Sequence, residues 1–195
     1  MTVFDAGWGQ IFQILTNPVL LHVLKWQLIL NLSSWIIYKM SVRIDFAQSS
    51  ADFDNARKMF IDYAESLWFS LSFQGFEDEL EHLPGKYAAP KGCILLAWDE
   101  LDCVGCAGLR PLSDDVCEMK RLYVKPLYRG TGLGRLLAEK IVQLGIDKKY
   151  TRMQLDTLNS MQSAVGLYKS LGFVETDQYY NNPHPEVVFF ELTLD

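Results

Sequence analysis

The stretch Glu118-Met-Lys-Arg-Leu-Tyr-Val-Lys-Pro-Leu-Tyr-Arg-Gly-Thr-Gly-Leu-Gly-Arg135 predicts a strand that stops at Pro126, turns, and enters a helix through a glycine-rich loop. Gly130, Gly132 and Gly134 leave the backbone N–H groups of the helix start uncovered, and the helix dipole favours negative charge there. Sixteen positions hold five basic residues and no acid: Lys120, Arg121, Lys125, Arg129 and Arg135. The chain as a whole has a formal net charge of -6, so this local reversal of sign predicts an anion site, and a pyrophosphate is the ligand that suits it.

The glycines also have a purely structural explanation, and two other phosphate-binding motifs fit the sequence less well. They could serve only to allow tight packing of a helix on a strand. The dinucleotide-binding fingerprint fits poorly, because Arg135 stands where its third glycine belongs and the loop follows several strands. The phosphate loop of nucleotide hydrolases needs Gly-Lys-Ser or Gly-Lys-Thr, which the sequence lacks.

The residues around this stretch predict one α/β domain that begins near Ser41. Apolar spacings of 3, 1, 4 and 3 from Leu133 to Leu144 are typical of one face of a helix. Gly172 is a natural stop for a second helix, with Phe173 folding back on its last turn. The remaining expected elements are strands near 42–46, 93–98, 103–109, 116–124, 153–156, 173–179 and 187–194, helices near 50–67 and 160–171, and a loop with a short helix over 69–83.

Composition bounds the class of protein. With 195 residues, 49% of them hydrophobic, the chain suits a single globular domain, and its negative net charge argues against a protein that coats nucleic acid. No secretory signal is present, and the four cysteines predict buried thiols in a reducing cytoplasm. Cys103 and Cys106 would lie on opposite faces of a strand, so we expect no metal site there.

The first forty residues differ in composition from the rest. Residues 11–38 contain one formal charge, Lys25, but a central lysine costs about 3 kcal/mol in a membrane span and polar residues interrupt the segment. Three interpretations remain open: a weak membrane-surface anchor, a helix packed on the domain or a partner, and a stretch outside the working fold. Met40, directly before the first strand, favours the third.

Two signatures resemble the GNAT superfamily of acetyl-CoA-dependent N-acetyltransferases. Arg129-Gly-Thr-Gly132-Leu-Gly134 matches the pyrophosphate loop of that family, and the preceding Leu122-Tyr-Val124 is similar to its pantetheine-binding strand. About thirty residues later, Ala164 to Phe173 resembles the second signature. The resemblance covers residues 41–195, an acetyltransferase domain, and leaves residues 1–40 as an apolar extension outside it.

The resemblance implies a mixed, mostly antiparallel sheet flanked by helices, and acetyl-CoA as acyl donor without a metal. The acceptor would be a primary amine of a small molecule or peptide. The oligomeric state is left open, with a homodimer as one option. A non-catalytic acyl-CoA sensor of the same fold is the alternative. One departure is Met161, where many members carry asparagine; Asn159 or Ser160 is then expected to cap the helix. The implied cofactor-binding residues are Leu122, Tyr123, Val124, Arg129, Gly130, Thr131, Gly132, Leu133, Gly134 and Arg135.

The resemblance also implies the catalytic groups. Tyr168, the tyrosine of the second signature, would protonate the departing thiolate, although a core aromatic is the alternative. Glu118 would be the base, since strand alternation places it on one face with Lys120, Leu122 and Val124; a carboxylate paired with Lys120 or Arg121 is the alternative. Aromatic segments at 68–76 and 179–186, together with Asp156 and Glu186, would wall the acceptor cleft.

The apolar extension generates the first prediction. A chain that starts at Met40 should fold and keep its transferase activity, because the domain from Ser41 has its own first strand and a complete set of later elements. Its solubility should improve, since a large apolar patch invites association. Thermal unfolding and acetyl-CoA turnover of the two chains provide the measurement, and an unfolded shortened chain would make the segment part of the core.

Overall fold

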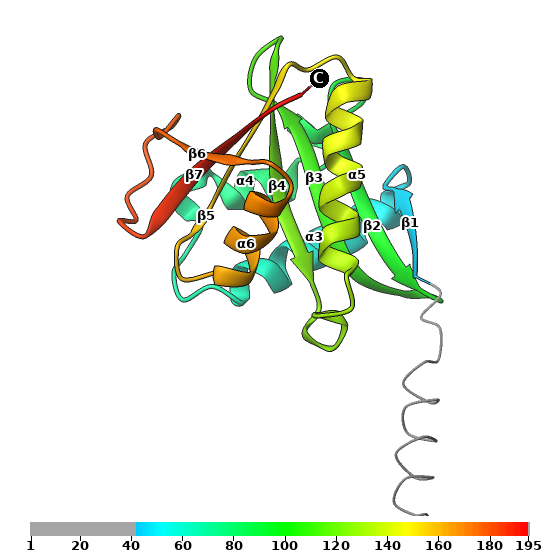
Figure 1. Cartoon of the computed structure of the whole chain (residues 1–195). Helices are drawn as coiled ribbons and strands as arrows, with labels where there is room; N and C mark the ends of the chain where they lie inside the picture. The colour runs from blue at the N-terminus through cyan, green and yellow to red at the C-terminus, as the bar shows by residue number, and fades with distance from the viewer. Residues whose placement is uncertain (1–41, 195) are drawn as a thin grey trace, which may run out of the picture. The chain divides into compact units, whose positions relative to one another are not determined.

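A computed structural model describes residues 42–194, and it is built around one seven-stranded sheet (Figure 1). The strand order is β1-β2-β3-β4-β5-β7-β6, and only β4 and β5 run parallel. The expected mixed, mostly antiparallel sheet is therefore confirmed. The strands are β1 (Val42–Phe46), β2 (Cys93–Asp99), β3 (Asp102–Pro111), β4 (Val116–Val124), β5 (Arg152–Leu158), β6 (Val174–Thr176) and β7 (Val187–Thr193).

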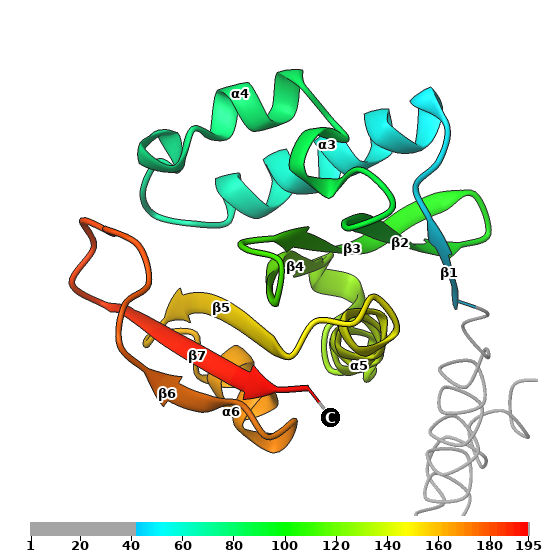
Figure 2. The ribbon, with the colours of Figure 1, turned by 90° about the horizontal axis from the view of Figure 1, so that it is seen from above.

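Helices cover both faces of the sheet (Figure 2). One face carries α3 (Ser50–Glu65) and the short α4 (Phe76–Glu81), and the other carries α5 (Leu133–Asp147) and α6 (Gln162–Ser170). Short 3₁₀ helices are η1 (Ser72–Gln74), η2 (Gly85–Tyr87) and η3 (Pro126–Tyr128). Along the chain, each predicted helix falls within a few residues of its observed position.

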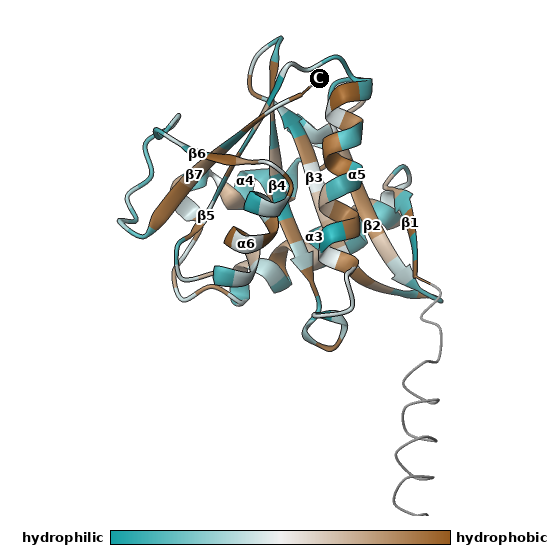
Figure 3. Ribbon diagram, viewed as in Figure 1, coloured by the Kyte–Doolittle hydropathy of each residue, from teal (hydrophilic) through white to brown (hydrophobic). Residues whose placement is uncertain are grey.

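Two apolar clusters fill the spaces between the sheet and its helices. On the α5 side, Leu133, Leu137 and Ile141 are buried against the sheet, and the apolar spacing of this helix appears as alternating hydrophobic and hydrophilic residues in Figure 3. On the other side, Phe60 of α3 and Phe76 of α4 are buried. A sheet covered on both faces needs apolar residues in consecutive positions, which explains the nearly continuous burial of β2, β3 and β4.

The ends of α6 show one confirmed prediction and one error. Gly172 adopts a φ of 91°, in the left-handed region that glycine tolerates, and Phe173 packs on Tyr168 with 5.9 Å between ring centroids. The expected cap by Asn159 or Ser160 is wrong, because the helix begins at Gln162 and no side chain caps it. The N–H group of Asn159 instead bonds to the carbonyl of Glu186, which ties this turn to the final hairpin.

The prediction that the side chains of Cys103 and Cys106 lie on opposite faces of their strand is also wrong. Both thiols are buried in the same apolar cluster, on the α3 side of the sheet. Their strand β3 has one extra residue opposite β2, since Gly105 pairs with Ala97 and Cys103 pairs with Trp98. This bulge at Val104 shifts the side-chain alternation by one position. Within residues 42–194, no group of three or more His, Cys, Asp or Glu side chains is arranged to hold a metal.

The strands β4 and β5 diverge after a short parallel pairing. They pair at three positions only, from Val116 with Arg152 to Glu118 with Gln154, whereas β4 continues to Val124 and β5 to Leu158. The edge of β4 that faces β5 is therefore left without a strand partner after Glu118. This opening lies next to the glycine-rich loop at the start of α5.

The apolar segment at 11–38 lies outside the described residues. Of the helices within 42–194, none combines the length and the apolar character that crossing a membrane requires.

Candidate active site

A bulge in β4 sets the geometry of the site. Gly108 pairs with Lys120 and Cys106 with Tyr123, so two residues of β4 oppose Ala107 alone. At this insertion the backbone of Arg121 adopts a φ of 56°, in the left-handed region that residues other than glycine disfavour. The alternation that predicted one common face for Glu118, Lys120, Leu122 and Val124 is consequently wrong beyond Lys120: Leu122 and Val124 pack with the cluster on the α5 side.

The side chain of Arg121 is held by an ion pair with Glu79 of α4. Its Nε and Nη2 atoms donate to the two carboxylate oxygens at 3.0 and 2.7 Å, and the Tyr87 hydroxyl donates to the same carboxylate at 2.8 Å. The guanidinium lies between the rings of Tyr63 and Phe76, at 5.8 and 5.0 Å from their centroids. A bidentate pair of this kind fixes both distance and orientation, so it anchors the bulge to α4.

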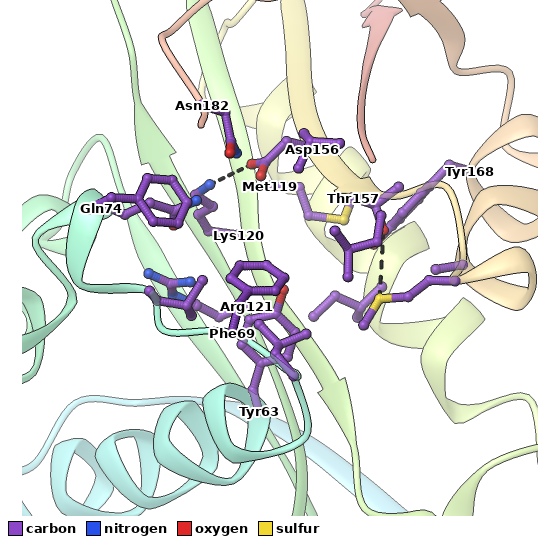
Figure 4. A pocket seen from close by; sticks show the side chains of 18 residues that line it. Tyr63, Phe69, Gln74, Met119, Lys120, Arg121, Asp156, Thr157, Tyr168 and Asn182 are labelled. Carbon is purple, nitrogen blue, oxygen red and sulfur yellow. Dashed lines mark hydrogen bonds and ion pairs between the residues drawn. The ribbon is translucent and has the colours of Figure 1, made fainter. Parts of the chain in front are cut away.

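The inner pocket lies beside the bulge, between β4, β5 and α6 (Figure 4). Its volume is about 60 Å³. Lys120 and Asp156 point toward each other in it, with 2.5 Å between Nζ and Oδ1, and the Tyr180 hydroxyl donates to Oδ2 at 2.8 Å. Further lining side chains include Tyr63, Gln74, Arg121, Met161 and Tyr168.

The charge state of Asp156 follows from these contacts. Burial raises the pKa of its carboxyl, but the charge and hydrogen bond of Lys120 outweigh that effect and bring the pKa below the usual aspartate value. The pocket therefore contains an ionised carboxylate at neutral pH.

An outer groove of about 450 Å³ adjoins the inner pocket. The two cavities share Tyr63, Leu122, Met161 and Ala164 as lining residues. The groove follows the half of β4 that has no strand partner on the β5 side, and Leu122, Tyr123, Val124 and Arg129 line it. The structure thus brings together the predicted strand residues and the first residue of the predicted loop.

The glycine-rich loop has the features of an anion cradle. Gly132 is the N-cap of α5, and no side chain caps this helix, so its first N–H groups are available to a ligand. Gly130 and Gly132 have φ values of 76° and 91°, and a Cβ at either position would meet no atom within 4 Å. These two glycines therefore do not serve tight packing; they allow the loop conformation and keep space open above it.

Arg129 is anchored at the rim of the groove. Its Nε donates to the carbonyl of Val124 at 3.0 Å, and its guanidinium lies 5.6 Å from the centroid of the Tyr123 ring. Arg135 lies on the exposed side of α5, where it donates to Ser170 of α6.

Tyr168 reaches the inner pocket from α6. Its ring packs between Phe173 and Phe190, and only 6% of the residue is exposed. Burial without a compensating positive charge raises the pKa of its phenol well above the ordinary value, so the hydroxyl is protonated. In residues 42–194 the hydroxyl has no hydrogen-bond partner. Tyr168 is thus part of the core and also lines the inner pocket.

Glu118 does not line the inner pocket. It is fully buried, and its carboxylate accepts from Arg110 Nε at 2.5 Å and from the Tyr179 hydroxyl at 2.7 Å. Lys120 Nζ lies 3.4 Å from it and connects it to Asp156. The paired arrangement was one of the two interpretations from the sequence, with Arg110 as the main partner instead of Arg121.

The predicted acceptor walls come together at the mouth of the inner pocket. Phe69 and Phe73 line it from the connection after α3, and the His184 ring packs on Phe69 at a tilt of 38°, with 3.7 Å between centroids. Sequence reasoning missed the role of Gln74, which donates to Tyr180 across 106 positions of sequence. No local pattern marks such a pair.

Comparisons with known proteins agree on one family. The acetyltransferase (GNAT) family model matches residues 56–173. The chain is 39% identical over 156 residues to a Schizosaccharomyces pombe protein named as uncharacterized N-acetyltransferase C1271.07c, covering 79% of this chain and 96% of that protein. A shorter match, 39% identical over 54 residues, is to the thialysine N-epsilon-acetyltransferase of Sus scrofa, covering 28% and 32% of the two chains.

A solved structure has the same fold. The yncA acetyltransferase from Salmonella typhimurium, determined with its cofactor acetyl-CoA, superimposes with a TM-score of 0.64 at 18% identity, over 80% of this chain and 95% of that one.

The Arg121–Glu79 pair leads to a prediction about stability. Burial raises the pKa of Glu79, but Arg121 outweighs it, so the pKa of the folded state lies below the usual value. The pair therefore stabilises the fold above about pH 4 and loses its contribution as the pH falls through the folded pKa. Glu79→Gln should lower the free energy of unfolding at pH 7 by about 3–5 kcal/mol, because it leaves a buried guanidinium without its charge partner.

Denaturant unfolding between pH 3 and 7 provides the measurement. The variant should lose less stability than the wild type as the pH falls over this range. Glu81→Gln, the same change at an exposed position of α4, is the control and should leave the unfolding midpoint nearly unchanged. Equal behaviour of the two variants would contradict a structural role for the pair.

Proposed function

This chain belongs to the acetyltransferase (GNAT) family, and from that premise we propose that it transfers the acetyl group of acetyl-CoA to a primary amine of a small molecule or peptide. One observation carries the proposal: an outer groove with an anion cradle at its rim joins an inner pocket that holds an ionised carboxylate and a protonated tyrosine. A long donor with a phosphate-bearing end and a reactive end needs this arrangement.

The residues of the groove suit acetyl-CoA. The N–H groups at the start of α5 and the guanidinium of Arg129 would hold the pyrophosphate, and the unpaired edge of β4 from Leu122 to Val124 would bond to the amide groups of the pantetheine arm. When bound, acetyl-CoA supplies an electrophilic thioester carbonyl and a thiolate leaving group. A backbone N–H of the β4 bulge would stabilise the negative charge that develops on the carbonyl oxygen.

The inner pocket suits the amine. An ammonium ion must lose a proton before it can attack, and Asp156 is the carboxylate that lines this pocket. Glu118 was predicted as the base. We propose that it acts indirectly, through Lys120, which lies within 3.4 Å of both carboxylates and keeps Asp156 in position.

Tyr168 would give its proton to the departing thiolate. Because its pKa is raised, the phenol is a weaker acid than a thiol in water, whose pKa is about 8.5, so proton transfer to such a thiolate would be unfavourable. Desolvation in the same pocket also raises the pKa of the thiolate, because burial disfavours the charged form of both groups. Proton transfer between two similarly buried groups is therefore closer to balance than a comparison of the buried phenol with a thiol in water suggests.

An acceptor screen tests the function. Purified protein, acetyl-CoA and a panel of alkylamines, amino acids and peptides are mixed, and release of the free CoA thiol is measured. We expect release with at least one primary amine, together with the acetylated product by mass spectrometry. Tight binding of acetyl-CoA without release with any acceptor would favour the sensor instead of the enzyme.

The cradle gives a prediction about cofactor affinity. Arg129→Ala should weaken acetyl-CoA binding by about 1–3 kcal/mol through loss of a charged hydrogen bond, and Gly132→Asp should weaken it through charge repulsion at the helix start. Isothermal titration provides the measurement. Lys140→Ala removes the same charge from the exposed side of α5, and Gly132→Ala tests backbone strain without charge. Unchanged binding in folded Arg129 and Gly132→Asp variants would refute the assignment.

Tyr168→Phe gives a prediction about turnover. The ring contacts with Phe173 and Phe190 remain, and only the proton donor is lost. We expect kcat to fall by about a hundredfold or more, with little change in acetyl-CoA affinity. Tyr150→Phe is the control, because its buried hydroxyl bonds to the carbonyl of Lys91 instead of facing the pocket. Normal turnover of the Tyr168 variant would leave this residue as a core aromatic.

A further inference from the structure

Three hydrogen bonds meet at the hydroxyl of Tyr180. The partners are Gln74 Nε2 at 3.0 Å, Asn182 Nδ2 at 2.8 Å and Asp156 Oδ2 at 2.8 Å. A phenol has one hydrogen to donate and two lone pairs that accept. The three bonds therefore use the full capacity of this oxygen, and only one of them can be donated by Tyr180.

The charge of Asp156 decides which bond that is. Its carboxyl is paired with Lys120 and is ionised, so it can only accept. Tyr180 must donate to Asp156, and the other two partners must donate to Tyr180. The amide NH₂ of Gln74 consequently faces Tyr180, and its carbonyl oxygen is turned away from it.

This orientation leaves the Oε1 atom of Gln74 without a partner. It is buried, and among the buried side-chain nitrogen and oxygen atoms of residues 42–194 it alone lacks a hydrogen bond. The corresponding oxygen of Asn182 accepts from the backbone N–H of His184 at 3.0 Å. Both amides bind the same hydroxyl and both line the inner pocket, but only Gln74 keeps an oxygen in need of a donor.

We propose that Gln74 determines acceptor specificity by accepting an N–H hydrogen bond from the amine substrate at Oε1. The inference rests on the proposed function and names the substrate class more closely. On the way to an amide an ammonium ion loses two protons, one before the attack and one as the tetrahedral intermediate collapses. A nitrogen that also keeps an N–H donated to Gln74 throughout must start with three hydrogens, which favours primary amines over N-methylated ones.

The size of the pocket restricts the carbon next to the nitrogen. A volume of about 60 Å³ accommodates an amino group and a slender stem, since a single water needs at least 10–15 Å³ on the same measure. A branch at the first carbon would compete for this space with Lys120 and Tyr168. The preferred acceptor is therefore an unbranched primary amine of the form R–CH₂–NH₃⁺.

Three probe amines test this class on the wild-type protein. They are n-butylamine, N-methylbutylamine and sec-butylamine, each assayed by CoA thiol release with acetyl-CoA. We expect kcat/KM to be highest for n-butylamine, by about tenfold or more over either of the other two. Equal rates for the three would overturn the proposal.

Two variants then separate the oxygen of Gln74 from its amide nitrogen. Gln74→Met removes both, and we expect the KM for n-butylamine to rise by about tenfold to a hundredfold while the KM for acetyl-CoA stays unchanged. The melting temperature should fall no further than in the Asn182 variant below, because both changes remove one donor to Tyr180 and the oxygen of Gln74 has no structural partner to lose. Asn182→Leu removes an equivalent donor to Tyr180, and its amine KM should change less than threefold.

The outcomes distinguish the inference from the function on which it rests. Wild-type protein that acetylates none of the amines, here or in the wider panel, would refute the proposed function. Active wild-type protein with an unchanged amine KM in Gln74→Met, or with equal losses in the Gln74 and Asn182 variants, would refute only the role of the Gln74 oxygen.

Discussion

The buried pair between Arg121 and Glu79 is the interaction on which the geometry of the site depends. Arg121 occupies the left-handed region at the bulge of β4, a conformation that disfavours side chains other than glycine. Its guanidinium is held twice by Glu79 and flanked by two aromatic rings. The contacts of one side chain thereby fix the bulge, and they join the sheet to the short helix α4 on the acceptor side.

The bulge decides which residues the cleft can use. Before it, Lys120 faces the carboxylates of Glu118 and Asp156; after it, Leu122 packs on the opposite face with the α5 cluster. The divergence of β4 from β5 starts in the same region and leaves the edge of β4 open. These two irregularities bring the open edge of β4, Arg129 at the start of the glycine-rich loop, and the polar inner pocket beside one another.

Much of the fold was predictable because its signals are local. The apolar spacing of α5 and the glycine at the end of α6 depend on neighbours within a few residues, and both predictions are confirmed. Gly130, Gly132 and Gly134 predicted an anion site, and the open surroundings of the first two are consistent with it. The cap at Asn159 or Ser160 was wrong because the N–H of Asn159 bonds instead to the carbonyl of Glu186 in the final hairpin.

The sequence by itself therefore determined the family, the sheet with its helices and the position of the glycine-rich loop, all of which follow from contiguous patterns. Only the tertiary structure decided that the bulges at Val104 and Arg121 reverse the strand alternation, that Glu118 pairs with Arg110, and that Gln74 shares Tyr180 with Asp156. A bulge depends on the register of the partner strand, and a hydrogen bond between distant residues depends on the packing of whole elements. Neither leaves a periodic signal in the chain that forms it.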